Sequence, residues 1–401
     1  MQFFKMSGHL PRRVIMAVAA AGLVVPMAPV AQSRAAAPAP PAIVEAAPIA
    51  LLQDLSSGQT LFSREADRQF IPASLTKLMT TYAVFELIDK QQVSLHQMIT
   101  VDAETAKRWS GRGSSMYLRA GDKVSVDQLL AGIVTVSAND GCIALAKGLA
   151  GSVEGFTRIM NANAHELGMR DSHFNTPNGW PDEGRTYTSG RDLATLAKAL
   201  IQKHPEKYRR YFSMPEFTWN GRTQKNHNPI LNHVPGADGL KTGFTNEAGF
   251  GFVGSAEQEN RRLVMIIANT DSSRDRKDIA RAFMTWGFNA WKSRSLLKEG
   301  AIMGAARVQG GATQMVPLMM AEALAVTEPR SGPGGATPPP QLSIRYLGPI
   351  DAPIRKGQMI ASLEVKSGDE EARSVPLLAA HDVAEANWWQ RLRNGLSGLA
   401  G

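Results

Sequence analysis

The sequence predicts an α+β domain followed by a small all-β domain and a C-terminal amphipathic helix. Strand-like patterns occur early, at 49–62, and again late, at 236–269, with helical periodicity between them. After about residue 298 only short strand patterns remain. Because strands at both ends of the first domain enclose its helices, we expect them to share one antiparallel sheet, flanked by helices and joined to a helical subdomain.

The length and composition are those of a globular protein. The chain has 401 residues, 43% of them hydrophobic and 7% aromatic. That length allows about two domains of roughly 100–200 residues each. The net charge is +8, but residues 1–37 hold four positive charges and no acids, so the rest of the chain carries +4. Since no basic run is interleaved with aromatic residues, we do not expect a nucleic-acid partner.

The cysteine and histidine pattern predicts neither a disulfide nor a metal site. Cys142 is the only cysteine and lies in the apolar stretch GCIALAKGLA, so it is expected to be a small buried core residue. The eight histidines are scattered and form no His-x-x-x-His pair. We therefore expect no metal and no cofactor.

The N-terminus has the form of an export signal. Three basic residues precede an apolar run at 14–25, which is too short to span a bilayer comfortably, and small residues follow it. We expect residues 1–37 to be a signal peptide and the protein to be periplasmic; a retained N-terminal anchor is the alternative. Residues 38–47 are rich in proline and alanine and are expected to be a flexible mature N-terminus.

The first domain is predicted to span 48–297. Two apolar runs around Ser56–Gly58 predict a hairpin at 49–62. Pro72 suits the first turn of a helix whose apolar residues continue with helical spacing to Ile88. Further helices are predicted at 126–136, 138–150, 153–168, 190–203 and 276–292.

Three strands are predicted within 236–269. The first carries the Lys-Thr-Gly triplet at 241–243 and is expected at an edge of the sheet. A turn is predicted at Thr245–Glu247, and the last strand, 261–269, is a continuous apolar run typical of a buried position.

The second domain is predicted to span 298–382 and to be β-sandwich-like, with a Gly/Pro-rich interruption at 331–340. In the tail, 383–401, Trp388 and three leucines fall on one helical face, with Trp389 beside them and two arginines toward the other side. We expect this tail to lie as an amphipathic helix on an anionic membrane surface. Packing of the tail on its own β domain is the alternative.

The stretch IPASLTKLMT places Ser74 and Lys77 three residues apart on one face of a helix. A free lysine has a pKa of about 10.4 and is a poor base near neutrality. Burial and a second nearby cation would lower that pKa, and a neutral Lys77 could then accept the Ser74 proton during attack on a carbonyl. A serine nucleophile also needs a proton path to the leaving amine and an oxyanion site.

Two further segments supply those groups. The polar break VSANDG holds Ser137, which could relay a proton, and Asn139, which could hold a substrate amide. Lys241 on the edge strand is the expected second cation, and Gly243 allows close approach of a ligand to the backbone. Each motif is weak alone; their order, each in its expected helix, loop or strand, is far more specific.

The segments PASLTK, SAND and DGLKTGFT resemble the three motifs of the serine penicillin-recognising enzymes. Longer stretches are similar to the serine D-alanyl-D-alanine carboxypeptidases of low molecular mass, peptidase family S11, in the penicillin-binding protein 5 group. Examples are NAHELGMRDSHFNTPNGW and LSIRYLGPIDAPIRKGQMIASLEV. The resemblance covers nearly all of the mature chain. It implies a penicillin-binding, β-lactamase-like fold for the first domain.

The resemblance implies roles by position. Ser74 is implied as the acylated nucleophile, Lys77 as its base and Ser137 as the proton relay, with an oxyanion hole from the backbone N–H groups of Ser74 and Phe244. Arg276 is implied to assist in binding the substrate carboxylate, with Arg274 as a less favoured neighbour. The implied substrate-binding residues are Asn139, Lys241, Thr242, Gly243, Phe244 and Arg276. Phe244 stands where some members carry histidine, which leaves its side-chain role open.

The resemblance also implies the activity and partners. The implied reaction removes the terminal D-alanine from peptidoglycan pentapeptides through a Ser74 acyl-enzyme, with β-lactams as covalent inhibitors. Attachment to the periplasmic face of the inner membrane is implied through the tail. A β-lactamase is less favoured because we find no convincing Glu-x-x-x-Asn counterpart between Asn139 and Lys241, and because the extra β domain is foreign to class A enzymes. A DD-endopeptidase on the same fold and a catalytically inactive wall-binding protein are also compatible with the sequence.

Overall fold

The structure, a computed structural model, describes residues 37–330, 340–366 and 372–390. The predicted signal segment up to residue 36 and the tail beyond Gln390 lie outside these ranges. Contacts divide the described chain into two compact units, Pro38–Lys292 and the part that begins at Ser293. Each unit has its own hydrophobic core, so each is described by itself.

The first unit is built on one five-stranded antiparallel sheet, as predicted. Its order is β2-β1-β9-β8-β7, so strands from both ends of the unit pair with one another. Strand β7, which carries the Lys-Thr-Gly triplet, lies at the edge. The strands are β1 Ile49–Asp54, β2 Gln59–Arg64, β7 Ala237–Thr245, β8 Gly249–Gln258 and β9 Arg261–Thr270.

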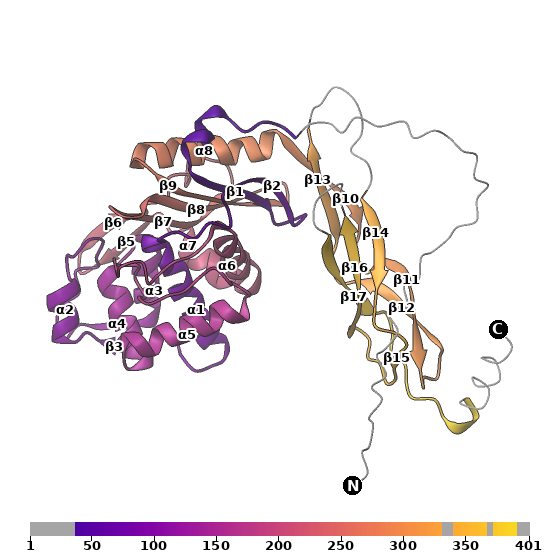
Figure 1. The fold of residues 1–401 in the computed structure, drawn as a ribbon. Helices are drawn as coiled ribbons and strands as arrows, with labels where there is room; N and C mark the ends of the chain where they lie inside the picture. Colours follow the sequence, from indigo (N-terminus) through magenta and orange to yellow (C-terminus); the bar gives the residue numbers. More distant parts are fainter. Residues whose placement is uncertain (1–36, 331–339, 367–371, 391–401) are drawn as a thin grey trace, which may run out of the picture. The chain divides into compact units, whose positions relative to one another are not determined.

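Helices cover both faces of this sheet (Figure 1). Helix α8, Ser273–Asn289, packs on one face, while the helical subdomain packs on the other and encloses the larger core. The subdomain contains η2 Ala73–Thr76, α1 Lys77–Asp89, α2 Ala103–Trp109, α3 Val126–Thr135, α4 Asn139–Ala150, α5 Val153–Glu166, α6 Gly190–Lys203 and α7 Pro205–Phe212. Two small antiparallel sheets of two strands join it, β3 Met98–Thr100 with β4 Lys123–Ser125, and β5 Glu216–Trp219 with β6 Arg222–Lys225.

Part of the segment 38–47, which we predicted to be a flexible N-terminus, has regular structure. Residues Ala42–Ala46 form the 3-10 helix η1, which packs against α8. Val44 is fully buried, and the Arg64 guanidinium donates to the carbonyls of Val44 and Ala47 at 3.0 and 3.3 Å. Burial of Val44 and these hydrogen bonds order a segment whose composition alone is typical of a linker.

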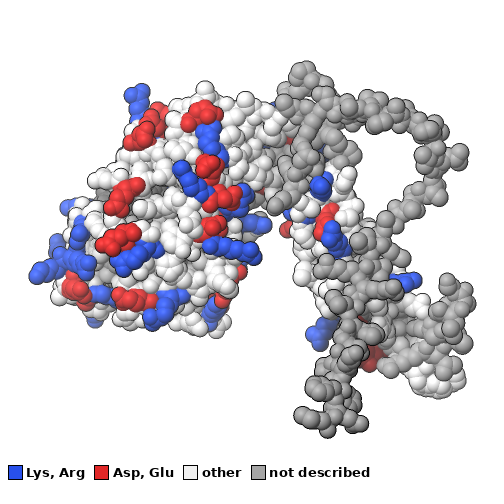
Figure 2. All heavy atoms as spheres, viewed as in Figure 1, with Lys and Arg blue, Asp and Glu red and all other residues white. Residues whose placement is uncertain are grey.

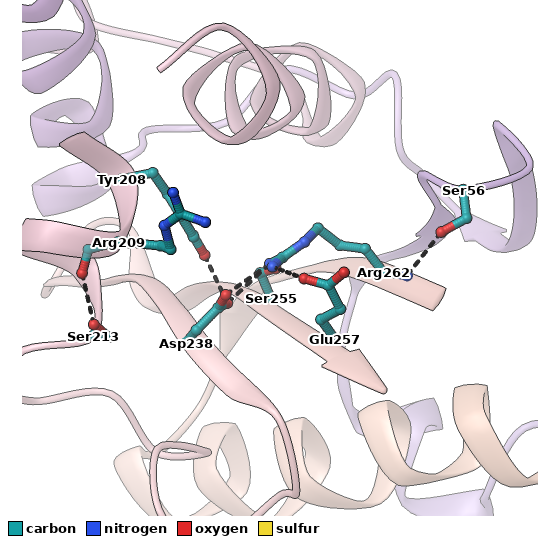
Figure 3. Close-up of polar contacts among 8 residues, drawn as sticks. All are labelled: Ser56, Tyr208, Arg209, Ser213, Asp238, Ser255, Glu257 and Arg262. Carbon is teal, nitrogen blue, oxygen red and sulfur yellow. Dashed lines mark hydrogen bonds and ion pairs between the residues drawn. The ribbon is translucent and has the colours of Figure 1, made fainter. Parts of the chain in front are cut away.

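A largely buried polar cluster fixes the beginning of β7 (Figure 3). The Arg262 side chain donates to Asp238 and Ser255, both at 2.8 Å, and also pairs with Glu257. The Tyr208 hydroxyl, from α7, donates to Asp238 at 2.8 Å. Because Asp238 lies three residues before Lys241, the cluster fixes the strand that brings the triplet to the helical subdomain.

The second unit is all-β. Its main sheet has the order β14-β16-β17-β12-β11-β15, and β10 pairs with β13 in a separate two-stranded sheet. The division between the units falls between residues 292 and 293, inside β10, whereas we expected it after 297. The strands are β10 Trp291–Leu297, β11 Ile302–Gln309, β12 Met315–Met320, β13 Leu324–Pro329, β14 Gln341–Arg345, β15 Ile350–Asp351, β16 Met359–Lys366 and β17 Arg373–Ala379.

The surface and the described end of the tail carry further features. On the face seen in Figure 2, basic and acidic side chains are interspersed over the first unit. Trp388 and Trp389 are 61% and 65% exposed, and their rings stack with centroids 3.7 Å apart. Within the described ranges, no helix is both long enough and apolar enough to cross a membrane.

Candidate active site

A pocket of about 260 Å³ opens between the helical subdomain and β7. Most of the residues predicted for the site line this pocket, and the remaining two, Lys77 and Lys241, bond directly to lining residues. The lining residues are Ser74, Gly113, Ser114, Ser137, Asn139, Asn178, Gly179, Trp180, His227, Thr242, Gly243, Phe244, Thr245, Phe250 and Arg276.

Ser74 lies in the 3-10 turn η2, directly before α1 begins at Lys77. Side chains at i and i+3 eclipse one another in a 3-10 turn, which aligns the serine and lysine side chains more closely than an α-helix does. The Lys77 Nζ donates to the Ser74 Oγ at 2.9 Å. Ala73, just before the serine, has a φ of 49°, a conformation that costs energy for a residue with a Cβ.

The Lys77 amine is held by two further acceptors. It donates to Asn139 Oδ1 at 2.9 Å and to the Asn178 carbonyl at 2.6 Å, and its side chain is only 1% exposed. The turn that carries Asn178 is fixed to α1 by a bond from Thr80 Oγ1 to the Pro177 carbonyl at 2.5 Å. Asn139 is fixed in turn, since its Nδ2 donates to the Arg112 carbonyl at 3.0 Å.

Ser137 lies in the predicted break between α3 and α4 and lines the pocket. It is 3% exposed and has a φ of 62°, in the left-handed region. Its hydroxyl makes no hydrogen bond to Ser74 or Lys77 in the part of the chain that the structure describes. The structure therefore places Ser137 at the site without a formed proton relay.

The edge strand β7 forms the other wall. Lys241 and Thr242 are 3% and 7% exposed, and the Lys241 Nζ donates to the Thr242 carbonyl at 3.0 Å. A Cβ on Gly243 would lie 2.8 Å from the Pro72 carbonyl oxygen and 3.2 Å from the Leu75 nitrogen. The absence of a side chain at 243 lets β7 approach the turn that carries Ser74.

The structure distinguishes the two arginine candidates on α8. Arg276 lines the pocket, and its guanidinium donates to the Gly243 carbonyl at 3.3 Å and lies 5.4 Å from the Phe250 ring centroid. Its buried Nε has no partner among the described residues. Arg274 is 86% exposed and lies 3.7 Å from Asp278, away from the pocket lining.

Burial shapes the electrostatics of this site. It lowers the pKa of Lys77 to about 8, against the opposing effects of Cys142 and Asp140. The pKa of Lys241 falls well below its usual value, through burial first and then the positive charge of Lys77. Burial also lowers the pKa of Arg276 to about 10. We expected burial and a second cation to lower the pKa of Lys77 together. Burial is the cause of its lowered pKa, and the repulsion between the two amines acts chiefly on Lys241.

Several pocket residues were missed by sequence reasoning. Asn178 acts through its backbone carbonyl, and Trp180 follows it in the same turn. His227 comes from the loop after β6; desolvation and the charges of Lys241 and Arg276 lower the pKa of His227 to about 4. The Asn-Gly turn at 178–179 was a visible turn signal, but nothing in the local sequence indicates that it reaches Lys77.

Comparison with known proteins gives two family matches. The family described as D-alanyl-D-alanine carboxypeptidase matches residues 34–272. The family described as penicillin-binding protein 5, C-terminal domain, matches residues 291–385. Together they cover both units of the structure.

Individual relatives agree with these matches. A D-alanyl-D-alanine carboxypeptidase DacD of Salmonella typhimurium is 34% identical over 390 residues, which cover 96% of this chain and 97% of the relative. DacC of Escherichia coli, with the same description, is 35% identical over 85% of each chain. The crystal structure of penicillin binding protein 5 from Haemophilus influenzae superposes with a TM-score of 0.73, at 30% identity over 86% of this chain and 99% of that one. Penicillin-Binding Protein D2 of Listeria monocytogenes was solved in its ampicillin-bound form. It gives a TM-score of 0.55 at 31% identity, over 61% of this chain and 98% of the Listeria chain.

Proposed function

The chain belongs to the D-alanyl-D-alanine carboxypeptidase family, and from that premise we propose that it removes the terminal D-alanine from peptidoglycan stem peptides. The reaction is a serine-type hydrolysis in which Ser74 is acylated and water then releases the shortened peptide. The observation that carries the proposal is the hydrogen bond of 2.9 Å between Lys77 Nζ and Ser74 Oγ inside a buried site.

The contacts of Lys77 support its role as the base. Asn139 Oδ1 and the Asn178 carbonyl can only accept hydrogen bonds, whereas the Ser74 hydroxyl can accept or donate. When Lys77 is neutral, its two protons satisfy the two fixed acceptors. The lone pair then faces the Ser74 hydroxyl, which is the geometry needed to remove its proton.

The wall formed by β7 and α8 is suited to the substrate carboxylate. Thr242 and Arg276 line the pocket there, and Arg276 keeps its charge at neutral pH because its pKa of about 10 lies well above 7. A bound carboxylate would favour a proton on Lys241, and a charged Lys241 disfavours one on Lys77. Substrate binding thus favours the neutral form of the base.

The remaining roles follow the same geometry. The backbone N–H groups of Ser74 and Phe244 are proposed as the oxyanion hole, since both residues line the pocket. Asn139 is proposed to hold the substrate amide next to the scissile bond. Ser137 is proposed to pass a proton to the leaving amine once substrate fills the space beside its hydroxyl.

We propose β-lactams as covalent inhibitors, because they present a reactive carbonyl and a carboxylate to the same two walls. Support comes from the ampicillin-bound structure of the Listeria monocytogenes relative. We also propose export to the periplasm through residues 1–37 and attachment to the inner membrane through 383–401. The exposed tryptophan pair at the described end of that tail supports the second proposal.

The test uses a fragment of residues 38–383 and a peptide ending in D-Ala-D-Ala. We expect release of free D-alanine that is lost in Ser74→Ala. If a fluorescent penicillin labelled Ser74 but no D-alanine were released, the carboxypeptidase activity would be rejected, and the assignment of Ser74 as the nucleophile would stand. A folded sample that shows neither signal would reject the enzymatic proposal.

A further inference from the structure

An arginine that is not assigned to the reaction lies over the ring of Trp180, a residue that lines the pocket. The Arg112 guanidinium carbon lies 4.6 Å from the ring centroid of Trp180 and 5.6 Å from that of Trp109. The two indole rings pack edge to face with centroids 5.4 Å apart. In the described part of the chain, Arg112 forms no ion pair with a carboxylate.

This aromatic and cationic group is joined to the catalytic residues on both sides. The Arg112 carbonyl accepts from Asn139, which itself accepts from Lys77. Trp180 lines the pocket two residues after Asn178, whose carbonyl also accepts from Lys77. A Cβ on Gly113 would lie 2.9 Å from Asn139 Nδ2, so the backbone next to Arg112 lies directly against the site.

The direction in which the peptide substrate runs through the pocket brings it toward Arg112 and the two tryptophans. Its terminal carboxylate is placed at Thr242 and Arg276 on the β7 wall, and its scissile carbonyl at Ser74. The chain that precedes the scissile bond therefore leads away from β7, and we place it along the part of the lining that includes Gly113, Ser114 and Trp180.

We infer that Trp109, Arg112 and Trp180 form a subsite for a carboxylate on the peptide segment that precedes the two terminal D-alanine residues. The inference rests on the proposed function and adds a substrate preference to it. The two tryptophan rings attract the guanidinium through cation–π interactions and favour its position beside the pocket. Its N–H groups can then make a paired contact with a carboxylate. An arginine positioned in advance loses less conformational entropy when the anion binds.

The experiment compares acetylated peptides ending in D-Ala-D-Ala that differ only in a Glu or a Gln, placed one or two residues before the D-Ala pair. For the wild-type chain we expect kcat/KM to favour Glu by about fivefold in at least one of the two series. The preference should appear mainly in KM, since the contact precedes the chemistry, and should shrink as salt is raised.

Two substitutions localise the effect. Arg112→Gln should bring the Glu-to-Gln ratio close to one. Arg108→Gln is the matched control, because its substitution removes the same charge and Arg108 lies 5.6 Å from the Trp109 ring, as Arg112 does. Only Arg112 also lies over the ring of Trp180, which lines the pocket. In Arg108→Gln the ratio of kcat/KM for the Glu peptide to that for the Gln peptide should stay at the wild-type value. Arg112→Lys, which keeps the charge and loses the flat stacking surface, should give an intermediate ratio.

The outcomes separate this inference from the proposed function. Release of D-alanine at equal rates from Glu and Gln peptides in both series would overturn the subsite alone. An equal loss of preference in Arg108→Gln and Arg112→Gln would also overturn it, because general surface charge would then explain the effect. If the wild-type chain released D-alanine from no peptide, the proposed function itself would fail.

Discussion

At the scale of single residues, the proposed chemistry depends on one buried amine and the three groups around it. The sequence predicted Ser74, Lys77 and Asn139 from their spacing, and the structure brings them into direct contact. It could not predict the Asn178 carbonyl, which lies 101 residues after Lys77 and carries no side-chain signal. Backbone acceptors of this kind are fixed by tertiary packing and leave no trace in residue type.

The pH dependence of acylation follows from the state of Lys77. Burial lowers its pKa to about 8, so the base is mostly protonated at pH 6 and mostly neutral at pH 9. We expect kcat/KM to rise with pH, with a midpoint near 8, and to remain high until Arg276 loses its charge near 10. Stopped-flow penicillin acylation between about pH 5.5 and 10 measures this. A flat profile across pH 6–9 would argue against Lys77 as the base.

At the scale of secondary-structure elements, the site depends on the fit of β7 and the loop before α4 against the nucleophile turn. The long helices and the three late strands were predictable, because their apolar spacing extends over many residues. Helices α2 and α7 and the two small two-stranded sheets were missed. Helix α7 spans only Pro205–Phe212, and its buried Tyr208, Tyr211 and Phe212 have helical spacing over little more than one turn, which is too short to stand out in the sequence.

A substitution at Gly243 tests whether the close approach of β7 to the turn that carries Ser74 is needed for acylation. In Gly243→Ala the new methyl group would meet the Pro72 carbonyl and the Leu75 backbone, so we expect acylation by penicillin to slow at least about tenfold. Gly251→Ala is the matched control on β8, since its closest contact would be the flexible end of the Leu75 side chain. Equal acylation rates for the two variants would show that the strand spacing does not matter.

A substitution at Asp140 tests how much its buried carboxylate stabilises the loop beside the site. Its fully buried carboxylate accepts from the backbone of Met116, Leu118 and Gly141, at 2.9–3.0 Å, and from the Ser115 hydroxyl at 2.6 Å. We expect Asp140→Ala to lower the free energy of unfolding by about 2–4 kcal/mol, because four donors lose their acceptor.

Urea unfolding measures this loss. The control is Asp122→Ala, whose more exposed carboxylate accepts from Arg119 N. That variant should change the unfolding free energy by less than about 0.5 kcal/mol. A loss of similar size in both variants would contradict a special role for the buried carboxylate.

At the scale of the whole molecule, the chain consists of two units with separate cores. The α+β class and the all-β second domain could be predicted from the order of the elements. The exact division could not, because β10 follows α8 after a single residue and pairs with β13, which begins only at Leu324. Pairing between distant strands sets that boundary.

The tail gives a prediction for the intact protein. We expect the full mature chain to float with vesicles that contain anionic lipid and to be released as salt is raised. A chain that ends at Ala386, before the exposed tryptophan pair, should remain with the soluble fraction. Flotation of both chains to the same extent would place the membrane contact elsewhere.

The position of the covalent adduct decides whether Ser74 is the nucleophile. The mature chain is incubated with penicillin, digested, and mapped by mass spectrometry beside the Ser74→Ala variant. We predict one penicilloyl group, on the peptide that contains Ser74, and none in the variant. An adduct on any other residue, or one that persists in Ser74→Ala, would contradict the assignment of Ser74 as the nucleophile.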